Sequence, residues 1–153
     1  MIYTFRTSML LDVPLERAFA FFSDADNLVR ISPPASGLRI LTPGPITLGA
    51  GAEFELGMRL FVVPIRWRSL IARWDPPREF VDVQVHGPFK SWTHTHRFSA
   101  GPGGTTIEDD VRYEMPLGLL GRLVEPLVRR QLASVFRYRQ DVTRQALSTN
   151  TSL

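Results

Sequence analysis

Six segments with alternating apolar and polar residues follow one another between Gly37 and Glu114, and no helical pattern interrupts them. Short pieces rich in Gly and Pro separate them, such as Gly101-Pro-Gly-Gly104. Strands joined by connections this short pair antiparallel, because a parallel pair needs a long crossover. The sequence therefore predicts an antiparallel sheet with strands over residues 38–42, 53–61, 65–74, 80–86, 89–98 and 106–114.

One more strand and two short helices precede this run. Residues 3–11 alternate in the manner of a half-buried strand. Pro14 suits the first turn of a helix, and Leu15, Ala18 and Phe19 follow at helical spacing. Ser23-Asp24 then provides the N-cap of a second short helix.

The segment after Pro116 has helical periodicity. Pro126 predicts a break, so we expect a short turn at 117–123 and a long helix over about 125–147. At 1.5 Å per residue that helix is roughly 33 Å long, enough to cross a domain. It is the only element large enough to cover the apolar face of the sheet. The predicted class is α+β, with a curved seven-stranded antiparallel sheet around the helix and a hollow between them.

Length and composition fit one domain. The chain has 153 residues, 44% of them hydrophobic, which suits one core over residues 1–147 with a disordered tail at 148–153. Cysteine is absent, and no apolar run is long enough to span a membrane or to act as a signal peptide. The net charge of +3 is mild. The basic residues of the last helical segment are not interleaved with exposed aromatic residues, as they would be in a nucleic-acid binder. We predict a soluble cytoplasmic protein, monomeric or homodimeric, that binds no nucleic acid.

Several motifs resemble those of a known superfamily. They include Phe22-Ser-Asp24, Gly87-Pro88-Phe89 and the pair of segments Trp92-Thr-His94-Thr-His96-Arg-Phe98 and Asp109-Asp-Val111-Arg-Tyr113. Together they make nearly the whole chain similar to the SRPBCC superfamily (START-like, helix-grip), which includes polyketide cyclases and lipid-transfer domains. Within it the chain resembles bacterial proteins of the ligand-binding type. The resemblance implies a helix-grip fold with a hydrophobic cavity and no obligatory cofactor.

The segments 89–98 and 106–114 carry the sharpest chemical signal. His94 and His96 share one face of the first segment with the aromatic residues Trp92 and Phe98, and the polar residues between them point to the other face. In the second segment Asp109 shares a face with apolar residues. A turn centred on Pro102-Gly103 places His96 opposite Asp109, and a slip of two residues places His94 there instead. We therefore predict that Asp109 contacts one of these histidines. The contact is either a structural pair or a ligand anchor and acid–base couple.

A metal site is a weaker alternative. His94 and His96, with His86 and Asp109 nearby, offer imidazole ligands from one strand. No clear third ligand is evident, so the prediction is that no metal is bound.

Other inward-facing residues come from the middle strands and the helix. Trp67, Ser69 and Ile71 share one face, although Arg73 would continue it. In segment 80–86 burial alone favours the valine row, whereas the resemblance implies that Phe80, Asp82 and Gln84 point inward. The predicted ligand-binding residues are Trp67, Asp82, Gln84, Trp92, His94, His96, Phe98, Asp109, Val111, Tyr113 and Phe136.

Two functions are consistent with this pattern. The leading hypothesis is the binding of a small hydrophobic or amphipathic molecule, such as a lipid, a polyketide-like compound or an aromatic metabolite, in an internal cavity. The alternative is a cofactor-free enzyme of the cyclase or dehydratase type, in which a His–Asp pair moves protons. A third possibility is a partner-binding domain that uses the basic face of the long helix.

Overall fold

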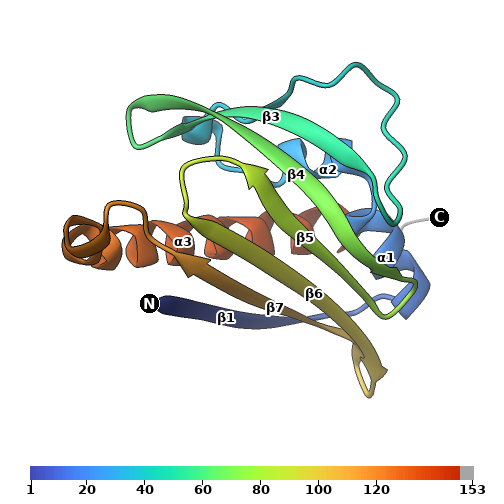
Figure 1. The fold of residues 1–153 in the computed structure, drawn as a ribbon. Coiled ribbons are helices and arrows are strands. Elements are labelled where there is room, and N and C mark those ends of the chain that lie inside the picture. Colours follow the sequence, from blue (N-terminus) through green and yellow to red (C-terminus); the bar gives the residue numbers. More distant parts are fainter. Residues whose placement is uncertain (149–153) are drawn as a thin grey trace.

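The computed structural model describes residues 1–148, which form a seven-stranded antiparallel sheet and one long helix (Figure 1). The strand order is β1-β7-β6-β5-β4-β3-β2, so the first strand lies beside the last. The strands are β1 Ile2–Leu11, β2 Arg39–Ile40, β3 Glu53–Leu60, β4 Val63–Asp75, β5 Glu79–His86, β6 Ser91–Gly101 and β7 Gly104–Glu114. The helices are α1 Leu15–Phe22, α2 Ala25–Arg30, the 3₁₀ turn η1 Pro34–Ser36 and α3 Gly118–Ser148. This architecture is the predicted helix-grip fold.

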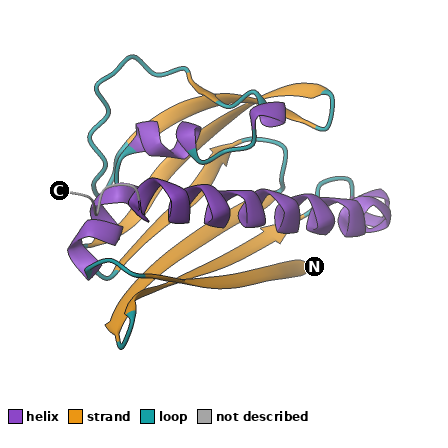
Figure 2. Cartoon of the chain, turned by 180° about the vertical axis from the view of Figure 1, so that it is seen from behind, coloured by secondary structure: helices purple, strands orange, loops and turns teal. Residues whose placement is uncertain are grey.

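The helix α3 crosses the concave side of the sheet, as Figure 2 shows from behind. Its 31 residues make a rod of roughly 45 Å. Val128, Phe136, Thr143 and Leu147 are buried on the side that faces the sheet. No helix in the described part of the chain is both long and apolar enough to cross a membrane.

The prediction that α3 begins near residue 125 was wrong. The helix begins at Gly118 and continues through Pro126. The ring of Pro126 lies on the exposed side, so the lost backbone hydrogen bond disturbs no packing. Contacts on both sides hold the segment in place: a Cβ on Gly121 would clash with the Pro116 carbonyl, and Glu125 accepts a hydrogen bond from Tyr113. Ser148 is the last helical residue rather than part of a tail, and the rest of the expected tail lies outside the described residues.

A β-bulge in β4 explains the position of Arg73. Ile71 pairs with Asp82, but Arg73 pairs with Val81, so Ala72 is an extra residue in the strand. The insertion exchanges the two faces of the strand beyond it. Arg73 is therefore exposed, and the next residue, Trp74, turns toward the core.

The solid part of the core lies where α1 covers the sheet. Phe19 makes edge contacts with Trp74, Phe80 and Phe98, at centroid distances of 5.2–5.9 Å. Aromatic pairs of this kind add about 0.5–1.5 kcal/mol each beyond their buried area. This end of the sheet is therefore closed by side chains, whereas the middle is not.

Candidate functional site

A cavity of about 220 Å³ lies between the sheet, α3 and the segment containing α2 and η1. Its wall is chiefly aromatic and aliphatic, with Phe54, Trp67, Trp92, Leu132 and Phe136 among the lining residues. The polar side chains that reach it include Asp82, His94, His96, Asp109, Arg139 and Thr143. The cavity is thus apolar with one concentrated polar region.

The centre of this polar region is a cluster of two histidines and two aspartates from three adjacent strands. Asp82 lies on β5, His94 and His96 on β6, and Asp109 on β7. The predicted register is confirmed, because His96 pairs with Asp109. Asp82 pairs with His94 on the other side of β6.

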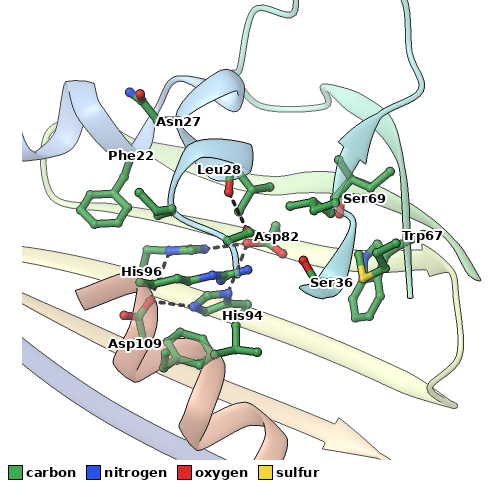
Figure 3. A pocket seen from close by; sticks show the side chains of 18 of the residues that line it. Phe22, Asn27, Leu28, Ser36, Trp67, Ser69, Asp82, His94, His96 and Asp109 are labelled. Atoms are coloured by element: carbon green, nitrogen blue, oxygen red, sulfur yellow. Dashed lines mark hydrogen bonds and ion pairs between the residues drawn. The ribbon is translucent and has the colours of Figure 1, made fainter. Parts of the chain in front are cut away.

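The shortest bonds run diagonally across the ladder. His94 Nε2 donates to Asp109 Oδ1 at 2.7 Å. His96 Nε2 donates to Asp82 Oδ2 at 2.6 Å, while its Nδ1 lies 3.4 Å from Asp109 Oδ1. The predicted contact of Asp109 is confirmed, and it involves both histidines. Figure 3 shows the imidazoles between the two carboxylates, and their ring centroids are 3.7 Å apart.

The two histidines have opposite electrostatic environments. Burial disfavours the charged form of His96, but hydrogen bonds with Asp109 and Asp82 outweigh it and raise its pKa to about 9. Burial and the positive charge of His96 lower the pKa of His94. Burial opposes ionisation of the aspartates, yet their histidine partners lower the pKa of both carboxyl groups. At neutral pH the cluster therefore holds one imidazolium, one neutral imidazole and two carboxylates.

Most predicted ligand-binding residues line the cavity. Those on its wall are Trp67, Asp82, Trp92, His94, His96, Asp109 and Phe136. Ser69 and Ile71 join Trp67 there, as their shared face indicated. Their role in binding stays a prediction.

Four predicted residues lie outside the lining of this cavity. The side-chain amide of Gln84 donates to the Phe89 carbonyl and accepts from its N–H, so it fixes the turn between β5 and β6 instead of facing the cavity. Tyr113 is fully buried and donates its hydroxyl to Glu125. Phe98 belongs to the packed aromatic core, and Val111 is buried in the centre of β7.

Two polar residues of α3 were not predicted from the sequence. Arg139 and Thr143 both line the cavity, although neither is among the predicted ligand-binding residues. The spacing of Phe136, Arg139 and Thr143 places all three on one helical face. That spacing was the available signal.

The third histidine of the alternative metal site, His86, lies away from the cluster. His86 is exposed at the end of β5. Among the described residues, donor atoms of Asp82, His94 and His96 lie within 4.8 Å of one another. However, the Nε2 atoms of both histidines are already engaged by carboxylates at 2.6–2.7 Å. The histidines and aspartates thus bond to one another, and the guanidinium of Arg139 interacts electrostatically with both carboxylates.

Comparison with solved structures supports the fold. The protein TTHA0849 from Thermus thermophilus aligns over 98% of this chain and 100% of its own, with 17% identity and a TM-score of 0.79. The di-domain ARO/CYC StfQ from the steffimycin biosynthetic pathway aligns over 100% of this chain and 53% of its own, with 13% identity and a TM-score of 0.75. Ara h 8.0201 covers 92% of this chain and 97% of its own, with 17% identity and a TM-score of 0.65.

The sequence itself identifies the family. No curated protein matches the chain significantly. The model of one family, described as polyketide cyclase / dehydrase and lipid transport, matches residues 11–137. That span covers most of the chain, including every member of the His–Asp cluster and six of the seven strands in full. The chain therefore belongs to the polyketide cyclase / dehydrase and lipid transport family, within the SRPBCC superfamily.

Proposed function

We propose that this protein binds a small hydrophobic or amphipathic molecule in the cavity between α3 and the sheet. The observation that carries the proposal is the cavity itself, which keeps about 220 Å³ of space beneath a wall of aromatic and aliphatic side chains. An engineered apolar cavity of about 150 Å³ in another protein is large enough to bind benzene. The cavity of this protein accordingly suits a molecule of one or two rings, or a short acyl chain.

Apolar contact provides the affinity in this proposal, and the polar cluster provides orientation. Transfer of apolar surface from water contributes about 25 cal/mol per Å². Polar groups gathered in one region of an otherwise apolar wall fix the orientation of a bound ligand. The family description and the name of StfQ are compatible with such a ligand.

A pair of substitutions on β4 tests the proposal. Ser69 is buried and lines the cavity, whereas Arg68 is the preceding residue on the opposite, exposed face. We expect Ser69→Phe to weaken binding of the neutral two-ring probe 2-isopropylnaphthalene at least tenfold, because the added ring occupies the ligand's volume. Arg68→Phe should leave the affinity unchanged. Quenching of Trp67 and Trp92 fluorescence reports the binding.

A thermal melt of each variant separates lost folding from lost binding. If Ser69→Phe does not fold, Ser36→Trp provides a second way to fill the cavity from η1, where Ser36 lines it and is half-buried. Equal probe affinity in folded Ser69→Phe, Ser36→Trp and wild-type protein would disprove binding in this cavity.

A cofactor-free cyclase or dehydratase is the second candidate function. The observation in its favour is the pair of stacked imidazoles on the cavity wall, whose surroundings shift their pKa values in opposite directions. Because Nε2 of His94 donates to Asp109, the lone pair of this neutral imidazole lies on Nδ1 and can accept a proton. His96 holds a proton that it can donate. A general base and a general acid are thus available side by side.

A further inference from the structure

Two polar side chains of α3 bring buried, unpartnered atoms to the cavity. Arg139 and Thr143 lie one helical turn apart and both line the cavity. Thr143 has no exposed surface, and Arg139 is largely covered. Within residues 1–148, the Thr143 hydroxyl and the Arg139 Nε atom are buried and have no hydrogen-bond partner.

Neither residue follows the usual behaviour of its type. A threonine inside a helix commonly donates its hydroxyl to the carbonyl four residues earlier, and Thr143 makes no such bond. The Nε atoms of Arg6, Arg97 and Arg129 each contact a carboxylate at 3.0–3.2 Å. The guanidinium of Arg139 instead lies over the Phe136 ring, 5.3 Å from its centroid.

An unsatisfied buried donor costs about 1–3 kcal/mol, so two of them on one wall call for an external partner. The Nε–H of arginine can only donate, and the hydroxyl of threonine can donate too. The atom that satisfies both is an oxygen with two lone pairs. An apolar ligand that carries such an oxygen would meet both donors from the cavity.

Charge in the cavity selects the kind of oxygen. Asp82 and Asp109 lie on the same wall and interact electrostatically with Arg139. Protonated His96 and Arg139 balance these two carboxylates, so a carboxylate on the ligand would add an uncompensated negative charge to a buried site, at a large cost in lost hydration. An uncharged oxygen meets the donors without that cost.

We propose that Arg139 and Thr143 form a donor pair that binds an uncharged carbonyl oxygen of the ligand. This inference rests on the proposed binding function and adds the chemical class of the ligand: an apolar molecule bearing a ketone or a similar oxygen. The α3 side of the cavity then determines the orientation of the ligand, while the His–Asp cluster faces it from the sheet.

Three naphthalene probes of similar size test the donor pair. They are 2-acetylnaphthalene, which carries a ketone, 2-isopropylnaphthalene, which lacks oxygen, and 2-naphthoate, which is an anion. Thr143→Val removes the hydroxyl at nearly constant volume, and Arg139→Met removes the guanidinium. We expect each substitution to reduce the preference for the acetyl over the isopropyl compound about fivefold, the value of one hydrogen bond.

Conservative variants provide the controls. Thr143→Ser keeps a hydroxyl and should retain most of the preference, and Arg137→Met removes an exposed arginine of the same helix and should change nothing. Affinities are measured by tryptophan quenching with the intact protein. A thermal melt confirms that each variant is folded.

Each outcome decides between the two proposals. If the isopropyl probe binds and neither Thr143→Val nor Arg139→Met alters the preference, the donor pair is disproved and the cavity remains a binding site. Tighter binding of 2-naphthoate than of 2-acetylnaphthalene would overturn the uncharged class of ligand. Failure of all three probes to bind wild-type protein would overturn the binding function and the donor pair together.

Discussion

Raising the pH from about 6.5 to 9 should destabilise this protein through His96. The folded protein holds a proton on His96 up to a pKa of about 9, because Asp82 and Asp109 accept hydrogen bonds from the imidazolium. In the unfolded chain the same group has its ordinary pKa near 6.5. Between these values the native state binds one more proton than the unfolded state, so the free energy of unfolding falls as the pH rises.

The size of the effect follows from the pKa difference. Each pKa unit corresponds to 1.36 kcal/mol, and about 2.5 units therefore give about 3 kcal/mol. The His96 side chain is only 12% exposed, so solvent screening removes little of it. The contribution is fully present below pH 6.5 and lost once the pH passes about 9. The lowered pKa of His94 acts in the opposite direction and reduces stability as the pH falls below 6.5.

Urea denaturation followed by tryptophan fluorescence measures this dependence at pH 6.5, 7.5, 8.5 and 9. The chain has three histidines, and the third, His86, is exposed at the end of β5 and provides the matched control. His86→Gln should keep the slope of stability against pH, and His96→Gln should lose it. Comparison with the control variant also removes contributions from the α-amino group.

A flat profile over this range in wild-type protein would refute the reasoning. The same conclusion would follow if His96→Gln retained the full slope, since another group would then be responsible. An imidazole NMR titration provides an independent check, because His96 should still be protonated at pH 8.

The other predictions concern one turn and the alternative activity. Gly104 has a φ of +125°, and a Cβ there would clash with the Leu11 carbonyl, so Gly104→Ala should cost at least about 2 kcal/mol of unfolding free energy by the order of magnitude of backbone strain. Gly101→Ala, whose Cβ would meet nothing within 4 Å, should be nearly neutral in the same urea assay; comparable losses in both would contradict the steric argument. If the protein catalyses proton transfer, a bound 1,3-diketone should exchange its α-protons in D₂O faster than in buffer, and His94→Gln, compared at saturating diketone, should abolish this gain. An NMR time course measures the exchange, and equal rates with and without protein would exclude this chemistry for the diketone tested.

The sheet could be predicted from the sequence because each step rests on local signals. The alternation of residues 92–98 and the turn at 102–103 fix both the inward row and the register, and these place His96 opposite Asp109. Which histidine makes the shortest bond to Asp109 was not predictable. That choice depends on the side-chain directions and on Asp82, which occupies the other side of β6.

The errors share a different physical origin. The extra residue at Ala72 changes which residues of β4 point inward. A prediction from strict alternation of inward and outward residues does not include such a bulge. Pro126 stays helical because tertiary contacts of Gly121 and Glu125 override its local preference. Arg139 is missing from the predicted site because a charged residue on a helix is usually exposed, whereas here its side chain lines the cavity. In each case the deciding contact comes from a residue distant in the sequence or from a local irregularity.

The diagonal bonds of the His–Asp cluster carry an evolutionary consequence. They tie β5, β6 and β7 together through side chains, so no member can be replaced alone without leaving a buried charge or an imidazole unmatched. A substitution at Asp82 would favour a compensating change at His96, and one at Asp109 a change at His94. In descendants of this sequence we expect these four positions to be inherited together or exchanged together for an apolar set.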